Sequence, residues 1–393
     1  MKWKNKGHEL DQTAEEISEL VRLNDKIYVF GAGVYGKNTQ EILEYLHMFG
    51  GYIDNDEEKQ KNGVDGREVI SFDQFIKSGR KNQIVIAADK KNIPIISRQL
   101  SESGLELHKN YFAYEEFMYR FLPIIMAYVY DTSFVALAQI CLTERCSLKC
   151  EKCAHGCFNV GNDASDMETA VAFQSADSFF AKVDVCGEFV LIGGEPLLYR
   201  DLPEVIAYVG EKYRGQMMIF SITTNGTILP GPSVIEMCQK YDVTFRISNY
   251  SKEIPALKEK YEKLTALLDE NHISYTLGKP EEEWIDYGFD SVVRDADEEK
   301  LTEVFDACKT PCREIRGDKF YYCVMARSVS DNLKFHEGED DYLDMSALTG
   351  EDYKKILLEF GVGYSDKGYL DMCRRCNGAE AYRYPVPAAR QRR

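Results

Sequence analysis

The chain has 393 residues, more than one ordinary domain needs, so we expect two or three domains. Hydrophobic residues make up 44% of it, which is typical of globular proteins and excludes a disordered or fibrous class. The formal net charge of −17 argues against binding to nucleic acid or to anionic membranes, and we interpret the basic tail RQRR as a solvated end.

No secretory or membrane-spanning segment is predicted. The first residues, MKWKNKGHEL, are basic but are not followed by the apolar stretch of a signal peptide. The most apolar segment, 121–142, contains Asp131 and many β-branched residues, so we interpret it as a buried linker and strand. The 12 cysteines are clustered, which favours metal binding in a reducing compartment over disulfides, and we therefore expect a cytoplasmic protein.

The first 115 residues alternate strands with helices. A short apolar run at 26–30 precedes the stretch GAGVYG and a helical pattern over 38–49, and further strands are predicted up to Asp54 and over 83–88. One face of the helix over 38–49 is expected to carry Ile42, Leu43, Leu46 and Phe49. This alternation predicts a small α/β domain with a parallel sheet over residues 1–115.

The glycine turn of this domain has the pattern of a nucleotide-binding turn. Gly31, Gly33 and Gly36 follow a strand and open a helix, and Asp54 ends the next strand. A helix amino terminus can bind phosphate, and the carboxylate can bind ribose hydroxyls. The layout resembles small Rossmann-like domains of bacterial sugar acyltransferases, which implies a pocket for a nucleotide or nucleotide-linked sugar. The alternative is a degenerate domain used only for packing or docking.

A second alternation of strands and helices begins after a linker over 116–133. About five β/α units are predicted between 134 and 300, which suits a full or partial parallel barrel. The active site of such a barrel lies at the carboxyl ends of its strands. The regular alternation fades after residue 300, so 301–393 is expected to be a third, cysteine-rich region.

Four cysteines follow the first barrel strand in the stretch RCSLKCEKCAHGC. Cys146, Cys150 and Cys153 have the spacing C-x₃-C-x₂-C. Three thiolates in one loop can bind three irons of a cubane cluster and leave the fourth iron open to a small molecule. A zinc site is the alternative. Cys157 lies outside the triplet and is expected to be structural.

Further residues at the ends of the next strands accompany the triplet. GGEP at 193–196 ends the second strand, and TNG at 224–226 ends the third. Together these features resemble the radical S-adenosylmethionine (radical SAM) superfamily, so the expected fold class is α/β, with a partial (β/α)₆ radical SAM barrel. The resemblance implies that S-adenosylmethionine contacts Gly193, Gly194, Glu195, Thr224, Asn225, Arg246 and Ser248. The sequence departs from the family at Lys152, where an aromatic residue near the adenine is common.

The resemblance also implies a reaction. A [4Fe–4S] cluster, reduced by a flavodoxin- or ferredoxin-type partner, cleaves S-adenosylmethionine to methionine and a 5′-deoxyadenosyl radical, which abstracts hydrogen from a substrate. We expect a small substrate, with a nucleotide-linked sugar as the first hypothesis and oxidation, epimerisation or rearrangement as the reaction. The alternatives are the modification of a ribosomally made peptide, and an iron–sulfur redox sensor or electron carrier without radical chemistry.

A second set of cysteines lies in the last region. The segment 312–323 is predicted to be a hairpin with Gly317 and Asp318 in its turn, so that Cys312 and Cys323 face each other, with Cβ atoms roughly 5 Å apart. The layout resembles the SPASM or twitch regions that follow many radical SAM barrels. It implies one auxiliary [4Fe–4S] cluster ligated by Cys312, Cys323, Cys373 and Cys376. Cys308 is a spare or replacement ligand, and a structural Cys₄ zinc site is the alternative.

Overall fold

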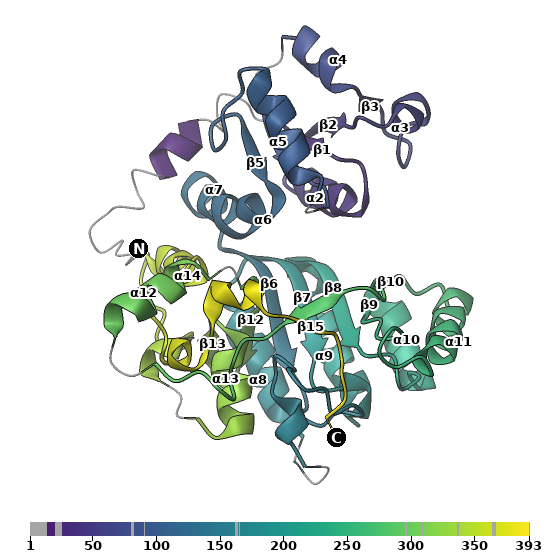
Figure 1. The fold of residues 1–393 in the computed structure, drawn as a ribbon, viewed down its shortest axis with the longest axis vertical. Coiled ribbons are helices and arrows are strands. Elements are labelled where there is room, and N and C mark those ends of the chain that lie inside the picture. The colour runs from purple at the N-terminus through teal and green to yellow at the C-terminus, as the bar shows by residue number, and fades with distance from the viewer. Residues whose placement is uncertain are drawn as a thin grey trace. The chain divides into compact units, whose positions relative to one another are not determined.

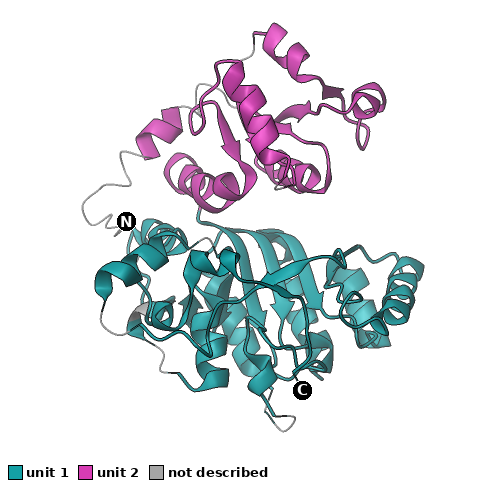
Figure 2. Cartoon of the chain, in the orientation of Figure 1, with its two compact units in different colours: residues 1–4, 133–393 teal, residues 5–132 magenta. Residues whose placement is uncertain are grey.

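The chain divides into two compact units. The computed structural model describes residues 14–19, 26–79, 82–89, 91–161, 164, 166–294, 297–308, 310–335, 338–363 and 367–392. One unit is Asn5–Thr132, and the other includes Ser133–Arg393 (Figure 2). These limits differ from the predicted ones, because 116–132 belongs to the first unit and 301–393 shares a unit with the predicted barrel.

The first unit is built on a five-stranded parallel sheet (Figure 1). Its elements are β1 (Ile27–Phe30), α2 (Val34–Tyr45), β2 (Phe49–Ile53), α3 (Glu57–Asn62), β3 (Val69–Ile70), α4 (Phe72–Lys77), β4 (Gln83–Ile86), α5 (Ile93–Glu102), β5 (Tyr111–Ala113), α6 (Tyr114–Glu116) and α7 (Leu122–Val129). The strand order β3-β2-β1-β4-β5 is that of doubly wound α/β sheets. The predicted parallel sheet is therefore confirmed.

Two details of this unit correct the prediction. Phe49 begins β2 instead of extending the helical face, because α2 ends at Tyr45 and His47 adopts a left-handed φ of 58°. The predicted linker is helical, and Phe121 packs on Phe112 of β5 with ring centroids 4.8 Å apart. Its apolar residues thus complete the core of the first unit.

The second unit begins with five strands separated by helices. Its first elements are β6 (Phe134–Cys141), α8 (Thr169–Phe180), β7 (Val185–Ile192), α9 (Leu202–Tyr213), β8 (Met217–Thr224), α10 (Pro232–Tyr241), β9 (Val243–Ile247), α11 (Leu257–Glu270) and β10 (Tyr275–Leu277). The elements that follow are β11 (Glu283–Ile285), α12 (Glu298–Asp306), β12 (Arg313–Arg316), β13 (Lys319–Tyr321), α13 (Val324–Leu333), β14 (Tyr342–Asp344), α14 (Tyr353–Gly361), the 3₁₀ helices η7 (Asp371–Arg375) and η8 (Gly378–Arg383), and β15 (Pro385–Pro387).

The large sheet joins the predicted barrel to the cysteine-rich region. Its order is β10-β9-β8-β7-β6-β12-β13-β14, and the strands from β10 to β12 are parallel. The sixth parallel strand, β12, lies beside the first strand of the barrel and not after the fifth. This pairing explains why 301–393 is not a separate unit.

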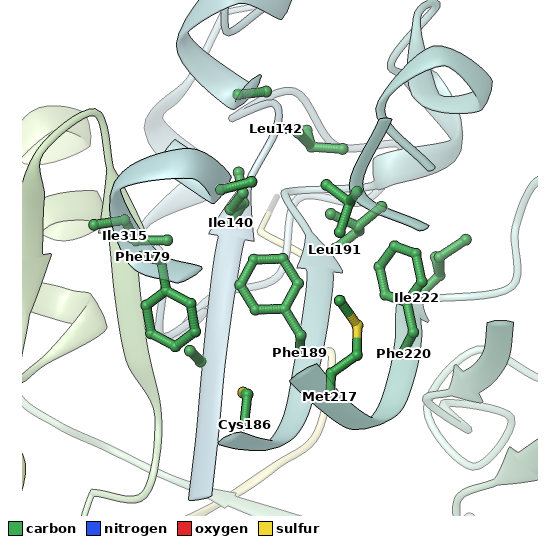
Figure 3. Packing of buried hydrophobic residues seen from close by; sticks show 14 of the residues in the cluster. Ile140, Leu142, Phe179, Cys186, Phe189, Leu191, Met217, Phe220, Ile222 and Ile315 are labelled. Atoms are coloured by element: carbon green, nitrogen blue, oxygen red, sulfur yellow. The ribbon is translucent and has the colours of Figure 1, made fainter. Parts of the chain in front are cut away.

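The two faces of this sheet differ in chemistry. Alternate side chains pack against the helices, and Figure 3 shows Ile140, Phe189, Leu191, Phe220 and Ile222 from three neighbouring strands in that core, with Leu142 directly after β6. Because strand side chains alternate, the intervening residues face the other side of the sheet, and several are polar. The polar residues Gln139, Glu188, Ser221 and Arg246 belong to this second face.

Within the described residues, no helix combines the length and apolarity needed to cross a bilayer.

Candidate functional site

The three predicted cluster ligands lie in the loop that follows β6. They are Cys146, Cys150 and Cys153, and all 12 cysteines of the chain are free thiols. The Sγ atom of Cys146 accepts a hydrogen bond from Asn225 Nδ2 at 3.5 Å, and that of Cys150 accepts one from Gln391 Nε2 at 3.3 Å. Hydrogen bonds to the sulfurs are one way in which proteins tune iron–sulfur clusters. The basic tail that we predicted to be a solvated end therefore contacts this loop.

The thiols of the loop differ in acidity. Burial raises the pKa of Cys146 to about 11 and that of Cys150 to about 12. The hydrogen bond from Cys157 lowers the pKa of Cys153 to about 7. Cys157, which we expected to be structural, is itself buried and lies in contact with a predicted ligand.

The two glycines of the GGEP stretch pack directly against the cysteine loop. The Gly194 amide donates to the Thr143 carbonyl at 2.7 Å, and the Glu195 amide donates to the Arg145 carbonyl at 2.9 Å. A Cβ atom on Gly194 would lie 2.3 Å from the Arg145 oxygen, so only glycine fits there. The end of β7 is therefore fixed to the start of the loop.

Glu195 connects the ends of two barrel strands. Its carboxylate is fully buried and accepts hydrogen bonds from Thr224 Oγ1 and from the Asn225 amide, both at 2.8 Å. Burial raises the pKa of Glu195 to about 7. Since Asn225 also donates to Cys146, three of the predicted S-adenosylmethionine contacts are gathered beside the first predicted ligand. Their contact with S-adenosylmethionine stays a prediction.

Arg246 and Ser248 lie at the end of β9. The Ser248 amide donates to the Thr224 carbonyl at 2.9 Å. Arg246 pairs with Glu188 Oε2 at 3.2 Å, and Ser221 donates to Glu188 Oε1 at 2.6 Å. Glu188 and Ser221 were not predicted from the sequence, although each alternates with buried apolar residues along its strand.

A buried charged network lies behind the loop and was also missed. Arg327 of α13 is 1% exposed and pairs with Glu314 and with Glu144, the residue two positions before Cys146. Although burial acts in the opposite direction, Arg327 lowers the pKa of Glu144. Asn332, at the other end of α13, donates to Glu144 Oε2 at 2.8 Å. The helix that starts after Cys323 is thereby bonded to the cluster loop.

The second set of cysteines surrounds the predicted hairpin. The hairpin has the predicted register, with Arg316 opposite Lys319 and Glu314 opposite Tyr321, so Cys312 precedes β12 and Cys323 follows β13. Cys308 follows α12 and Cys323 caps α13, and both helices pack on η7, which contains Cys373. Cys376 comes directly after η7.

The thiols of the second set are buried, and several of them raise one another's pKa. Burial raises the pKa of Cys323, and the thiols of Cys308 and Cys376 raise it further. The same two thiols add to the effect of burial on Cys373. Burial also raises the pKa of Cys312, whose charged neighbours are Arg246 and Arg313, which lower it, and Glu188 and Glu314, which raise it. Cys308 therefore lies close to Cys323, Cys373 and Cys376, while Cys312 packs with Cys323 and Cys376 against one apolar cluster, and the choice of ligands among these five thiols stays a prediction.

The described His, Cys, Asp and Glu side chains include no group of three that could hold a single metal ion. The thiolates of a cubane cluster bind different irons and need not converge on one point. A loop of three free thiols with two amide donors to its sulfurs fits such a cluster.

Lys152 borders a pocket beside the cysteine loop. The pocket has a volume of about 300 Å³, and its walls include Phe158, Tyr287 and Phe289. Lys152 Nζ lies 3.0 Å from Asp286 Oδ2 and 2.9 Å from an oxygen of Asp290. The position that is commonly aromatic in the family is thus an ion pair here, next to aromatic walls supplied by other residues.

The glycine turn of the first unit is closed by its own residues. The Asp54 carboxylate accepts a hydrogen bond from the Ala32 amide at 2.8 Å and pairs with Lys59 at 2.9 Å. Gly31 has a φ of 114°, and a Cβ atom on Gly36 would lie 1.8 Å from the Gly31 oxygen. These glycines and Asp54 shape the turn, and nucleotide binding there stays a prediction.

Residues 140–251 match the model of the Radical SAM superfamily. These residues form a radical SAM domain. The match supports a [4Fe–4S] cluster and S-adenosylmethionine as the cofactors of the radical SAM domain, and the remaining cysteines are compatible with a further cluster.

Individual proteins resemble the chain only in part. A probable GTP 3′,8-cyclase of Methanococcus aeolicus is 31% identical over 91 residues, which are 23% of this chain and 29% of that protein. The chain thus matches less than a third of that relative's length.

Three solved structures overlap with the chain. BtrN in complex with AdoMet and 2-DOIA has a TM-score of 0.38 at 15% identity, over 65% of this chain and all of that chain. Native anSMEcpe with bound AdoMet and Cp18Cys peptide has a TM-score of 0.30 at 18% identity, over 37% of this chain and 42% of that chain. Streptococcus suis SuiB bound to precursor peptide SuiA has a TM-score of 0.29 at 15% identity, over 69% of this chain and 58% of that chain. All three TM-scores are below 0.5, so these similarities say nothing about substrate.

Proposed function

We propose that the protein is a radical SAM enzyme in which Cys146, Cys150 and Cys153 hold a [4Fe–4S] cluster with one iron open to S-adenosylmethionine. The observation that carries the proposal is the set of bonds that join Glu195 and Asn225 to the cysteine loop inside the matched region. When bound and reduced, the cluster supplies one electron that cleaves S-adenosylmethionine to methionine and a 5′-deoxyadenosyl radical.

The residues of the chain bind and orient the reactants. Gly193 and Gly194 allow the end of β7 to approach the loop, and Glu195 fixes Thr224 and Asn225 at the end of β8. Together with Arg246 and Ser248, these residues are proposed to contact S-adenosylmethionine. The polar face of the sheet, with Glu188 beside Arg246, is proposed to orient a polar substrate.

The product of S-adenosylmethionine cleavage tests this function. Protein purified without oxygen and loaded with iron and sulfide is reduced with dithionite in the presence of S-adenosylmethionine, and 5′-deoxyadenosine is measured by liquid chromatography. We expect 5′-deoxyadenosine from the parent and none after Cys146, Cys150 and Cys153 are replaced by alanine. Cys238→Ala, a buried thiol of α10, is the matched control and should keep the activity. A loaded parent that releases no 5′-deoxyadenosine contradicts the proposal.

We propose a small polar substrate, with a nucleotide-linked sugar as the first class to test. The support is the parallel sheet of the first unit, with its glycine turn between β1 and α2. Calorimetric titration with UDP-glucose is expected to show binding that Gly33→Asp weakens, because the Gly33 position is open and a carboxylate there repels phosphate. The absence of heat with UDP-, GDP- and ADP-linked sugars contradicts this role.

We further propose that the second set of cysteines holds an auxiliary [4Fe–4S] cluster, with Cys308 in place of the predicted ligand Cys312. The support is the proximity of Cys308 to Cys323, Cys373 and Cys376 described above. About eight irons per chain are expected for two such clusters. Cys308→Ser should remove about four of them, whereas Cys312→Ser should keep all. Retention of iron by Cys308→Ser, or four irons with one zinc in the parent, contradicts the assignment.

A further inference from the structure

The last described residues of the chain pair with the loop that carries the predicted cluster ligands. Cys150 and Gln391 form an isolated antiparallel bridge, although 241 positions separate them. The Glu151 amide donates to the carbonyl before Gln391 at 2.8 Å, and the amide after Gln391 donates to the Lys149 carbonyl at 2.7 Å. Two backbone hydrogen bonds thus flank the predicted ligand Cys150.

The side chain of Gln391 adds two bonds to the same loop. Its Oε1 atom accepts from the Lys149 amide at 2.8 Å, and its Nε2 atom donates to Cys150 Sγ at 3.3 Å. Nε2 also donates to the Ala389 carbonyl at 2.7 Å. Because the Lys149 N–H needs an acceptor and the Ala389 carbonyl needs a donor, the amide can take only one orientation. That orientation directs an N–H group at the sulfur.

The neighbouring residues hold Gln391 in place. Ala389 is fully buried with a left-handed φ of 59°, a conformation that a non-glycine residue keeps only where its surroundings impose it. The Arg392 guanidinium lies 5.1 Å from the ring centroid of Phe158. Upstream, β15 pairs with β11, and Figure 1 shows this yellow segment running from β15 to the label C.

We propose that Gln391 is a positioning residue of the radical SAM cluster, which holds the ligand loop and raises the reduction potential of the cluster through Cys150. This inference rests on the proposed function. A donor to a thiolate stabilises negative charge, and the reduced cluster carries one more negative charge than the oxidised cluster, so the bond favours reduction. Asn225 acts in the same way on Cys146, which gives two ligands of the triplet an amide donor from a distant segment.

Substitution of Gln391 in the full, cluster-loaded chain tests the inference. Gln391→Met keeps the side-chain length and removes both polar atoms. We expect the midpoint potential of the S-adenosylmethionine-sensitive cluster to become more negative and its electron paramagnetic resonance g-values to shift. Gln391→Glu keeps an acceptor for Lys149 and puts a carboxylate beside the sulfur, so it should lower the potential further.

The control is Gln239→Met, which removes an exposed side-chain bond of α10 to the Asn271 carbonyl and should change neither quantity. Loss of iron from this cluster in Gln391→Met, with an unchanged thermal unfolding midpoint, supports the loop-holding role. A loaded Gln391→Met protein with the parent's potential and g-values overturns the inference. A parent without an S-adenosylmethionine-sensitive cluster contradicts the proposed function itself.

Discussion

A buried arginine links the segments that carry the two sets of cysteines. Arg327 is 1% exposed and lies between Glu314, which is fully buried, and Glu144 beside the cluster loop. A buried cation between two carboxylates is needed because each carboxylate would otherwise be an unpaired charge in the interior.

Replacement of Arg327 by methionine is therefore expected to be strongly destabilising. Loss of one partner of a buried ion pair costs about 3–5 kcal/mol, which urea unfolding of the parent and the variant can measure. The control is Lys263→Met, since the pair of Lys263 with Glu259 is exposed and should contribute less than about 1 kcal/mol. A loss for Arg327→Met as small as that of the control contradicts this role.

Asp341 links acidity to stability in the cysteine-rich region. It is fully buried, and it accepts hydrogen bonds from the Gly338 amide at 3.0 Å and from the Asp371 amide at 2.7 Å. Burial raises the pKa of Asp341 from 3.8 to about 6. Because the folded state then binds the proton more tightly, the contribution to stability is full below pH 3.8 and is lost as the pH rises through 6.

Asp341→Asn is expected to be more destabilising at pH 5 than at pH 7.5. Asparagine does not titrate, so the difference between the two pH values reports the Asp341 carboxyl, and it should be about 1 kcal/mol. Urea unfolding of parent and variant at both pH values measures it, with the exposed Asp269→Asn as control. An Asp341→Asn effect that does not change with pH means that the carboxyl is not perturbed.

At the scale of elements, the site depends on how closely the end of β7 approaches the cysteine loop. Gly194→Ala would place a methyl group against the Arg145 carbonyl, so the loop must move. We expect a loss of about 1–3 kcal/mol of stability and reduced iron in the first cluster. Gly215→Ala, where a Cβ atom meets nothing within 4 Å, is the control. Full iron and parent stability in Gly194→Ala would show that the contact is not needed.

Most helices and strands whose position depends on local hydrophobic periodicity and turn residues were predictable from the sequence. The strands from β6 to β10 and the hairpin register follow from periodicity and turn chemistry, as does the position of α9. The pairing of β12 with β6 was not predictable, because it joins segments 175 positions apart. The same reason hid Gln391 and Arg327, whose partners are chosen by tertiary packing and not by local sequence. The helix α7 was missed because its β-branched residues mimic a strand.

At the scale of the molecule, the radical SAM domain and all 12 cysteines belong to the second unit, and the first unit contains no cysteine. We therefore expect a shortened chain of residues 133–393 to fold, to bind iron and to cleave S-adenosylmethionine, while the nucleotide-sugar binding proposed for the first unit is lost. Iron content and the 5′-deoxyadenosine assay measure this. An insoluble or iron-free product would show that the units depend on each other.

The most direct measurement of the central claim is the electron paramagnetic resonance spectrum of the reduced protein with and without S-adenosylmethionine. If S-adenosylmethionine binds the open iron held by Cys146, Cys150 and Cys153, the g-values of a reduced [4Fe–4S] signal shift when it is added. This S-adenosylmethionine-sensitive signal should be absent when these three cysteines are replaced by alanine, whereas the signal of the proposed auxiliary cluster should remain. A spectrum that S-adenosylmethionine leaves unchanged would contradict the account and would favour an iron–sulfur protein without radical chemistry.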